Sequence, residues 1–133
     1  MTGPRPDGPQ RSAARRLAVI MLGAGCAHFL VPRRFDAIIP PALPGRARTY
    51  TYLSGSAALV IGAGLTTTRA RRPAAALAAA FFVAVMPAKL QLTADLLRDE
   101  SKPRWVKAIG VVQLFWQLPL ITEAIRAGRP TRT

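Results

Sequence analysis

The residues that could carry out chemistry in this 133-residue sequence are few, and they fall mostly inside apolar stretches. The chain has a single Cys, Cys26, which excludes a disulfide, a Cys-pair zinc site and a Cys-x-x-Cys redox couple within it. It also has a single His, His28, and no carboxylate lies within one helical turn of that residue, so we expect no metal site. We identify no catalytic constellation, and the sequence favours a protein that is not an enzyme.

Charged and apolar residues are segregated in blocks along the chain. The net charge is +13, half of all residues are apolar, and the Arg residues cluster between four long apolar stretches. A bilayer sorts a sequence in this way, whereas a soluble domain interleaves polar and apolar residues at the period of its helices or strands. We therefore predict an all-α integral membrane four-helix bundle. Its spans are expected at about residues 13–31, 50–67, 73–92 and 105–125.

The rest of the chain is expected to form short basic tails. Residues 1–12 are predicted to be a disordered tail, residues 13–127 a single transmembrane domain, and residues 128–133 a second tail. The Lys and Arg residues divide almost evenly between the two sides, so the first helix is expected to set the orientation. We predict a multi-pass protein of the bacterial plasma membrane with both termini in the cytoplasm. Because the Arg clusters flank the spans as topology signals do, we expect contact with the lipid bilayer and no binding of nucleic acid.

Polar side chains from different spans meet at one face of the predicted bundle. Ionisable and amide groups inside a span are costly, so they mark functional positions by default. Up-and-down order brings the end of the first span, the start of the second, the end of the third and the start of the fourth together. The predicted ligand-binding residues are His28, Tyr50, Ser54, Lys89 and Gln113. Tyr50 and Lys89 could also act only as interfacial anchors, and His28 and Gln113 could serve only as structural hydrogen-bonding partners. Gln117 is expected to hydrogen-bond between helices.

The loop between the first two spans, residues 32–49, is rich in proline and unusually apolar. Three of its apolar residues share one face of a helical turn beside two Arg residues, a pattern typical of a short segment lying in the headgroup plane. Its prolines exclude a long helix. This interfacial loop and the bulky last span are predicted to dock other membrane proteins or a second copy of the chain. The predicted docking residues are Phe35, Ile38, Ile39, Phe115 and Trp116.

Three blocks of sequence follow one another in a distinctive order: GAGCAHFLVPRRFDAIIPPALP, TYLSGSAALVIGAGL and VAVMPAKLQL. With a Gln in the last span, they resemble the DoxX-like family of small four-helix bacterial membrane proteins over about residues 20–120. The resemblance implies a four-helix membrane fold, and some members of that family are associated with quinone-linked sulfur oxidation or thiol-redox complexes. Many relatives carry a Glu where this chain has Ala58 and an Asn where it has Lys89, so this chain is expected not to run a redox cycle alone.

Three functions are compatible with these features. The first is a non-catalytic accessory or interaction subunit of a larger membrane complex, favoured by the small size and the predicted docking residues. The alternative is a redox-associated membrane protein that binds a quinone or a lipid-like ligand near His28 and Gln113, and no other cofactor is expected. The third is a small transporter. It ranks last because proton coupling needs an intramembrane carboxylate, and the acidic residues lie in tails, in loops or at the end of the last span.

Overall fold

The chain is built of helices. The computed structural model describes residues 8–130, which form six helices and no strand. The helices are α1 (Pro9–Leu30), α2 (Pro32–Asp36), α3 (Ala47–Thr66), α4 (Arg71–Ala84), α5 (Met86–Arg98) and α6 (Arg104–Gly128). The predicted all-α class is therefore confirmed for the described part of the chain.

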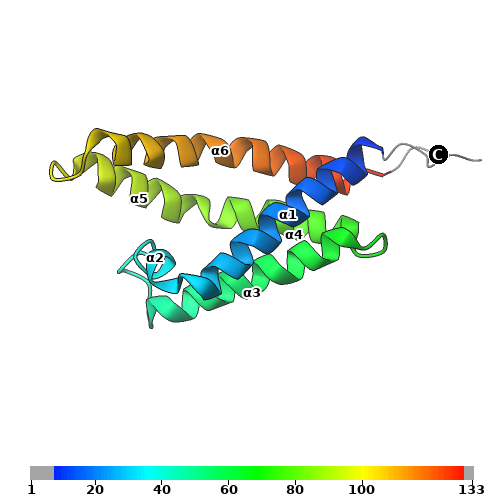
Figure 1. Cartoon of the computed structure of the whole chain (residues 1–133), viewed down its shortest axis with the longest axis horizontal. Coiled ribbons are helices and arrows are strands. Elements are labelled where there is room, and N and C mark those ends of the chain that lie inside the picture. Colours follow the sequence, from blue (N-terminus) through cyan, green and yellow to red (C-terminus); the bar gives the residue numbers. More distant parts are fainter. Residues whose placement is uncertain (1–7, 131–133) are drawn as a thin grey trace, which may run out of the picture.

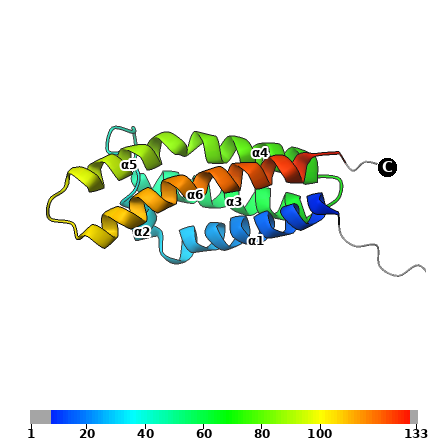
Figure 2. The same ribbon diagram turned by 90° about the horizontal axis from the view of Figure 1, so that it is seen from above.

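Four long elements lie side by side: α1, α3, α6 and the nearly continuous pair α4–α5 (Figure 1, Figure 2). α1 packs against α3 and α6, α4 packs against the same two helices, and α5 contacts α6. Successive long elements run in alternate directions, so the start of α1 and the end of α6 lie at one end (Figure 2). The short helix α2 lies at the other end, against the start of α3.

The core between these elements consists mainly of small side chains. Alanines of α1, α4 and α6 are buried there together with a few larger residues, which include Leu17, Met21 and Phe82. Small side chains let helix backbones approach closely, and in lipid such packing is a main source of attraction between helices. The sequence of these helices therefore fits association inside a bilayer.

The contact between α1 and α3 requires glycine at defined positions. A Cβ atom added at Gly25 would lie 2.7 Å from Leu59 Cγ, and one added at Gly62 would lie 2.8 Å from Leu22 Cγ. Gly23 differs, because a Cβ atom there would meet nothing within 4 Å. Close approach thus explains Gly25 and Gly62 but not Gly23.

Three helical segments of the described chain are long and apolar enough to cross a membrane: Pro9–Leu30, Arg71–Arg98 and Arg104–Gly128. The second segment comprises α4 and α5. Helix α3 has 20 residues but is not among these segments, because Arg48 and several hydroxyl-bearing residues in its first turns lower its hydropathy. Many large apolar side chains are exposed on the outer faces of these helices, which suits a lipid environment.

The first and last helices extend beyond the predicted spans. α1 begins at Pro9, inside the segment predicted as a disordered tail, of which residues 1–7 lie outside the described part. Ala13 and Ala14 are buried, so packing holds the start of the helix although Arg residues flank it. α6 likewise continues to Gly128, the first residue of the second predicted tail, of which residues 131–133 are not described. Hydropathy marks the end of an apolar run, whereas packing decides where a helix ends.

The third predicted span, residues 73–92, is divided in the structure. α4 ends at Ala84 and α5 begins at Met86, with Pro87 in the first turn of α5. Proline has no N–H to donate, and its ring clashes with the carbonyl of the preceding turn, so the helix is interrupted here. The interruption lies where α5 begins its course alongside α6, and it places Val85 and Lys89 at a cavity.

Candidate ligand-binding site

A cavity of about 280 Å³ lies among α1, α2, α3, α6 and the junction of α4 with α5. It lies toward the end of the molecule that carries α2, because its lining includes the last turns of α1 and the first turns of α3. Most of the wall is apolar, and polar groups are few. The lining residues are Ile20, Met21, Ala24, His28, Phe35, Ile38, Ile39, Thr51, Ser54, Ala58, Phe81, Phe82, Val85, Ala88, Lys89, Gln113, Gln117 and Leu120.

A chain of hydrogen bonds joins α5, α6 and α4 at the wall of the cavity. Lys89 Nζ donates to Gln117 Oε1 at 2.7 Å, and Gln117 Nε2 donates to the carbonyl oxygen of Phe82 at 2.8 Å. The side chain of Gln117 is fully buried, so both of its polar atoms depend on these partners. An ammonium group has three donors, and Gln117 uses one of those of Lys89. Lys89 therefore retains donors for a bound oxygen atom.

His28 is held in a defined orientation at the same cavity. Its Nδ1 lies 2.6 Å from the carbonyl oxygen of Ala24, and its ring stacks on Phe35 with 3.8 Å between the ring centroids. A carbonyl oxygen only accepts, so Nδ1 carries the proton and Nε2 of the neutral ring is an acceptor. Nε2 makes no hydrogen bond with any other described residue. The ring can therefore accept a hydrogen bond from a hydroxyl group.

Asp36 fixes α2 and the proline-rich loop to α3. Its carboxylate accepts a 2.7 Å hydrogen bond from Thr51 Oγ1 and a 2.8 Å hydrogen bond from Arg48 Nε. The Thr51 hydroxyl, assisted by the Arg48 guanidinium, holds the pKa of Asp36 below its ordinary value. Phe35 precedes Asp36, so this anchor also positions the ring that stacks on His28.

The structure brings together four of the five predicted ligand-binding residues. His28, Ser54, Lys89 and Gln113 all line the cavity, although they come from four different helices. Tyr50 does not line it, because its hydroxyl donates to the carbonyl oxygen of Pro44 at 2.6 Å and so ties the loop to α3. The ligand-binding role of these residues stays a prediction.

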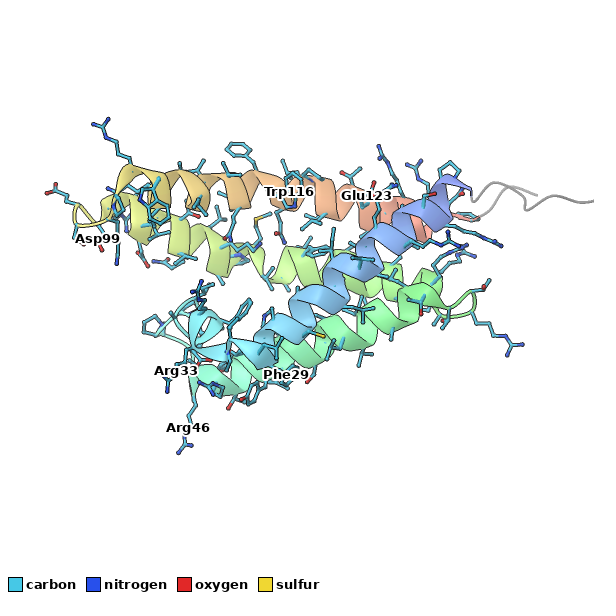
Figure 3. All side chains as sticks on the ribbon, viewed as in Figure 1. Phe29, Arg33, Arg46, Asp99, Trp116 and Glu123 are labelled. Atoms are coloured by element: carbon cyan, nitrogen blue, oxygen red, sulfur yellow. The ribbon has the colours of Figure 1, made fainter. Side chains whose placement is uncertain are left out.

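The predicted docking residues separate into two groups. Phe35, Ile38 and Ile39 line the cavity instead of forming an outward surface, because α2 and the turn after it fold back over the end of the helices. Phe115 and Trp116 are 67% and 62% exposed, and Trp116 lies near the middle of α6 (Figure 3). The second group is the more exposed of the two, and the docking role of both groups stays a prediction.

Sequence reasoning missed three of the residues that shape the site. Asp36 and Thr51 were not identified, although Asp36 is the one acidic residue in a basic loop, a signal that could have suggested an internal partner. Phe82 supplies a backbone carbonyl, for which no side-chain pattern gives a signal. Gln117 forms interhelical hydrogen bonds, as expected, but its pairing with Lys89 was not foreseen.

These observations define a class of protein: a helical protein with membrane-length helices that enclose an apolar cavity with a few fixed polar groups. Among residues 8–130, no group of three or more His, Cys, Asp or Glu side chains is placed to hold a metal ion. The model of the family described as "Domain of unknown function (DUF8561)" matches residues 17–128, so the chain belongs to this family. No curated protein and no solved structure matches the chain.

Proposed function

We propose that this chain is a four-span membrane protein that binds an amphipathic, lipid-soluble ligand of the quinone or quinol type. The observation that carries the proposal is the cavity whose mostly apolar wall includes His28, Lys89 and Gln113. Ligand sites are typically apolar concave spaces with a small number of placed polar groups, and about 300 Å³ is the lower end of their volumes. A space of this size suits a ring-sized head group whose tail leaves toward lipid.

The proposal of four spans includes α3, whose hydropathy is lower. Its 20 residues correspond to about 30 Å of helix, the thickness of the hydrocarbon layer. α3 packs along α1 through the glycine contacts and also against α4. An even number of crossings also agrees with the start of α1 and the end of α6 lying at one end. Cytoplasmic termini and a bacterial plasma membrane stay part of this proposal.

The polar groups of the cavity select the chemistry of the ligand. Lys89 offers N–H donors to a carbonyl or other acceptor oxygen, and the Gln113 amide offers both a donor and an acceptor. His28 offers an acceptor, since its Nδ1–H is occupied by Ala24. A ring that carries oxygen substituents, at least one of them a hydroxyl, satisfies all three groups. This complementarity favours the quinol state, or a phenol of similar shape, over the quinone.

Loss of His28 tests this function directly. His28→Ala should leave the helical content unchanged but weaken the binding of a short-tailed benzoquinol by about tenfold or more, because a buried hydroxyl would lose its acceptor. Equilibrium titration of the reconstituted protein measures the affinity. Ser56→Ala, an exposed change on α3, is the matched control. Quinol binding that is the same in the wild type and in His28→Ala would contradict the proposal.

A second function is favoured by the outer face of α6. Phe115 and Trp116 are adjacent large aromatic residues, both mostly exposed, and Trp116 borders a shallow depression of about 380 Å³ beside Val112 and Ile109. We propose that this face docks a further membrane protein, which would make the chain a non-catalytic accessory subunit. Copurification from native membranes tests it: Trp116→Ala should release the partner, whereas His28→Ala should not.

The resemblance to the DoxX-like family agrees with both proposals and stays a prediction. The blocks that carry it include His28 and Phe35, which stack on each other at the cavity. The resemblance thus covers part of the cavity wall, whereas Ala58 and Lys89 in the same wall stand where many relatives carry Glu and Asn.

A further inference from the structure

A second cavity lies at the opposite end of the molecule, where α1 begins and α3 leads into α4. It has a volume of about 340 Å³. Its lining residues are Arg11, Ala14, Arg15, Leu65, Thr66, Thr67, Thr68 and Arg71. His28 lies 17 positions after Arg11 in α1, which is about 25 Å of helix, so this cavity is independent of the quinol site.

Arg71 is the unusual residue of this cavity. Its side chain is charged at all physiological pH values, yet the residue is only 8% exposed. Its Nε is buried and has no hydrogen-bond partner, a state found for no other side-chain nitrogen or oxygen in the described part of the chain. A buried N–H donor without a partner is unfavourable. The arrangement therefore calls for an anion.

The surroundings of Arg71 are suited to an anion. Arg11 and Arg15 also line the cavity and bring two further guanidinium groups to it. The Thr66 and Thr67 hydroxyls donate to backbone carbonyls, whereas that of Thr68 keeps its donor. Arg71 is the first residue of α4, so the positive end of this 14-residue helix also lies here.

We infer that this cavity binds a phosphate group, held by Arg71 with the help of the surrounding cationic and hydroxyl groups. The planar guanidinium matches the oxygens of a phosphate better than a point charge does. Two sources offer the same chemistry: the head group of an anionic phospholipid and a free phosphate ion. The position at the end of the membrane-length helices favours the lipid, because head groups lie at that level and basic pockets between spans bind them.

The inference is tested with the full chain in phosphatidylcholine vesicles. One sample receives phosphatidylglycerol, one receives inorganic phosphate and one receives neither, and the unfolding midpoint of each is measured. A ligand that binds only the folded protein raises the midpoint. A rise with phosphatidylglycerol alone identifies the lipid head group as the source. A rise with inorganic phosphate as well shows that the ion suffices.

Arg71→Gln and Arg72→Gln form a matched pair, because each loses one positive charge and Arg72 is exposed. Arg71→Gln should weaken binding of the stabilising probe about tenfold or more, and Arg72→Gln by less than about threefold. Without either probe, Arg71→Gln should be at least as stable as the wild type, because it removes a buried N–H donor that has no partner. If Arg71→Gln does not fold, Arg71→Lys keeps the charge but loses Nε, and the same weakening is expected.

Two results would overturn this inference. One is a midpoint that neither probe raises in the wild type. The other is an equal loss of binding in Arg71→Gln and Arg72→Gln, which would show attraction to diffuse surface charge. Neither result bears on the quinol site, because His28 and Lys89 do not line this cavity.

Discussion

Replacing Gly55 by alanine should disturb the contact that positions His28. A Cβ atom at this position would lie 2.7 Å from His28 Cβ and 3.0 Å from Phe29 Cε2. His28 Cβ is attached directly to the α1 backbone, so it moves away only if α1 and α3 separate. Such overfilling costs about 1–3 kcal/mol. Gly23→Ala is the control, because a Cβ atom at Gly23 meets nothing within 4 Å.

The two substitutions gain the same stabilisation of the helix. Each replaces glycine by alanine inside a helix, which stabilises the helix by about 1 kcal/mol. Gly23→Ala should therefore be more stable than the wild type by up to about 1 kcal/mol. Gly55→Ala should be less stable than Gly23→Ala by about 1–3 kcal/mol, because only the crowding term differs.

Unfolding in mixed micelles measures this difference. Dodecyl sulfate is titrated into each variant while the helical circular dichroism is recorded, and the midpoints are compared. A loss of quinol binding in Gly55→Ala alone would link the contact to the site. The reasoning would be refuted by equal midpoints, or by a Gly55→Ala protein more stable than Gly23→Ala.

Three further predictions concern α2, the polar wall of the cavity and the outer face of α6. The Thr51 hydrogen bond lowers the pKa of Asp36 from 3.8, so the stabilisation by this carboxylate is complete above that value and is lost as the pH falls below it. Asp36→Asn should accordingly make Tm fall less steeply as the pH is lowered. If Tm depends on acid pH in the same way in the variant and the wild type, Asp36 is not this anchor. Lys89→Met should lower the free energy of unfolding by about 1–2 kcal/mol. Adding Gln117→Leu to Lys89→Met should lower it little further, because the two side chains are coupled. In a double-mutant cycle, two losses of free energy that simply add would contradict this coupling. Trp116→Ala should change stability in detergent by less than about 0.5 kcal/mol yet reduce crosslinking to neighbours in native membranes, and a large loss of stability would assign Trp116 to the fold.

The helical class and the approximate positions of the helices could be predicted from the sequence because charge and apolar residues are segregated. The ends could not. α1 begins at Pro9, before the predicted span that starts at residue 13, because hydropathy carries no information on the packing that holds the start of the helix. The interruption at Val85 follows from Pro87, but the direction taken by α5 depends on its contact with α6.

The candidate site was predictable in part. His28, Lys89 and Gln113 were found because polar residues inside apolar stretches are rare and up-and-down order brings them to one face. Which way Phe35 faces was not predictable, since an apolar side chain suits both a cavity and a lipid surface. The burial of Arg71 was not predictable either, because an Arg at the end of a span usually serves as a topology signal.

The central claim is that the cavity near His28 holds a quinol-type ligand, and filling that cavity tests it most directly. Ala88 lines the cavity, whereas Ala84, one turn earlier, is exposed on the surface. Ala88→Leu and Ala84→Leu add the same atoms, so they differ only in whether those atoms occupy the cavity. The affinity of each reconstituted variant for a short-tailed benzoquinol is measured by equilibrium titration. We expect Ala84→Leu to bind like the wild type and Ala88→Leu to lose binding about tenfold or more, because the added side chain takes the space of the ring. Equal affinity in both variants, with the fold of each intact, would contradict the claim.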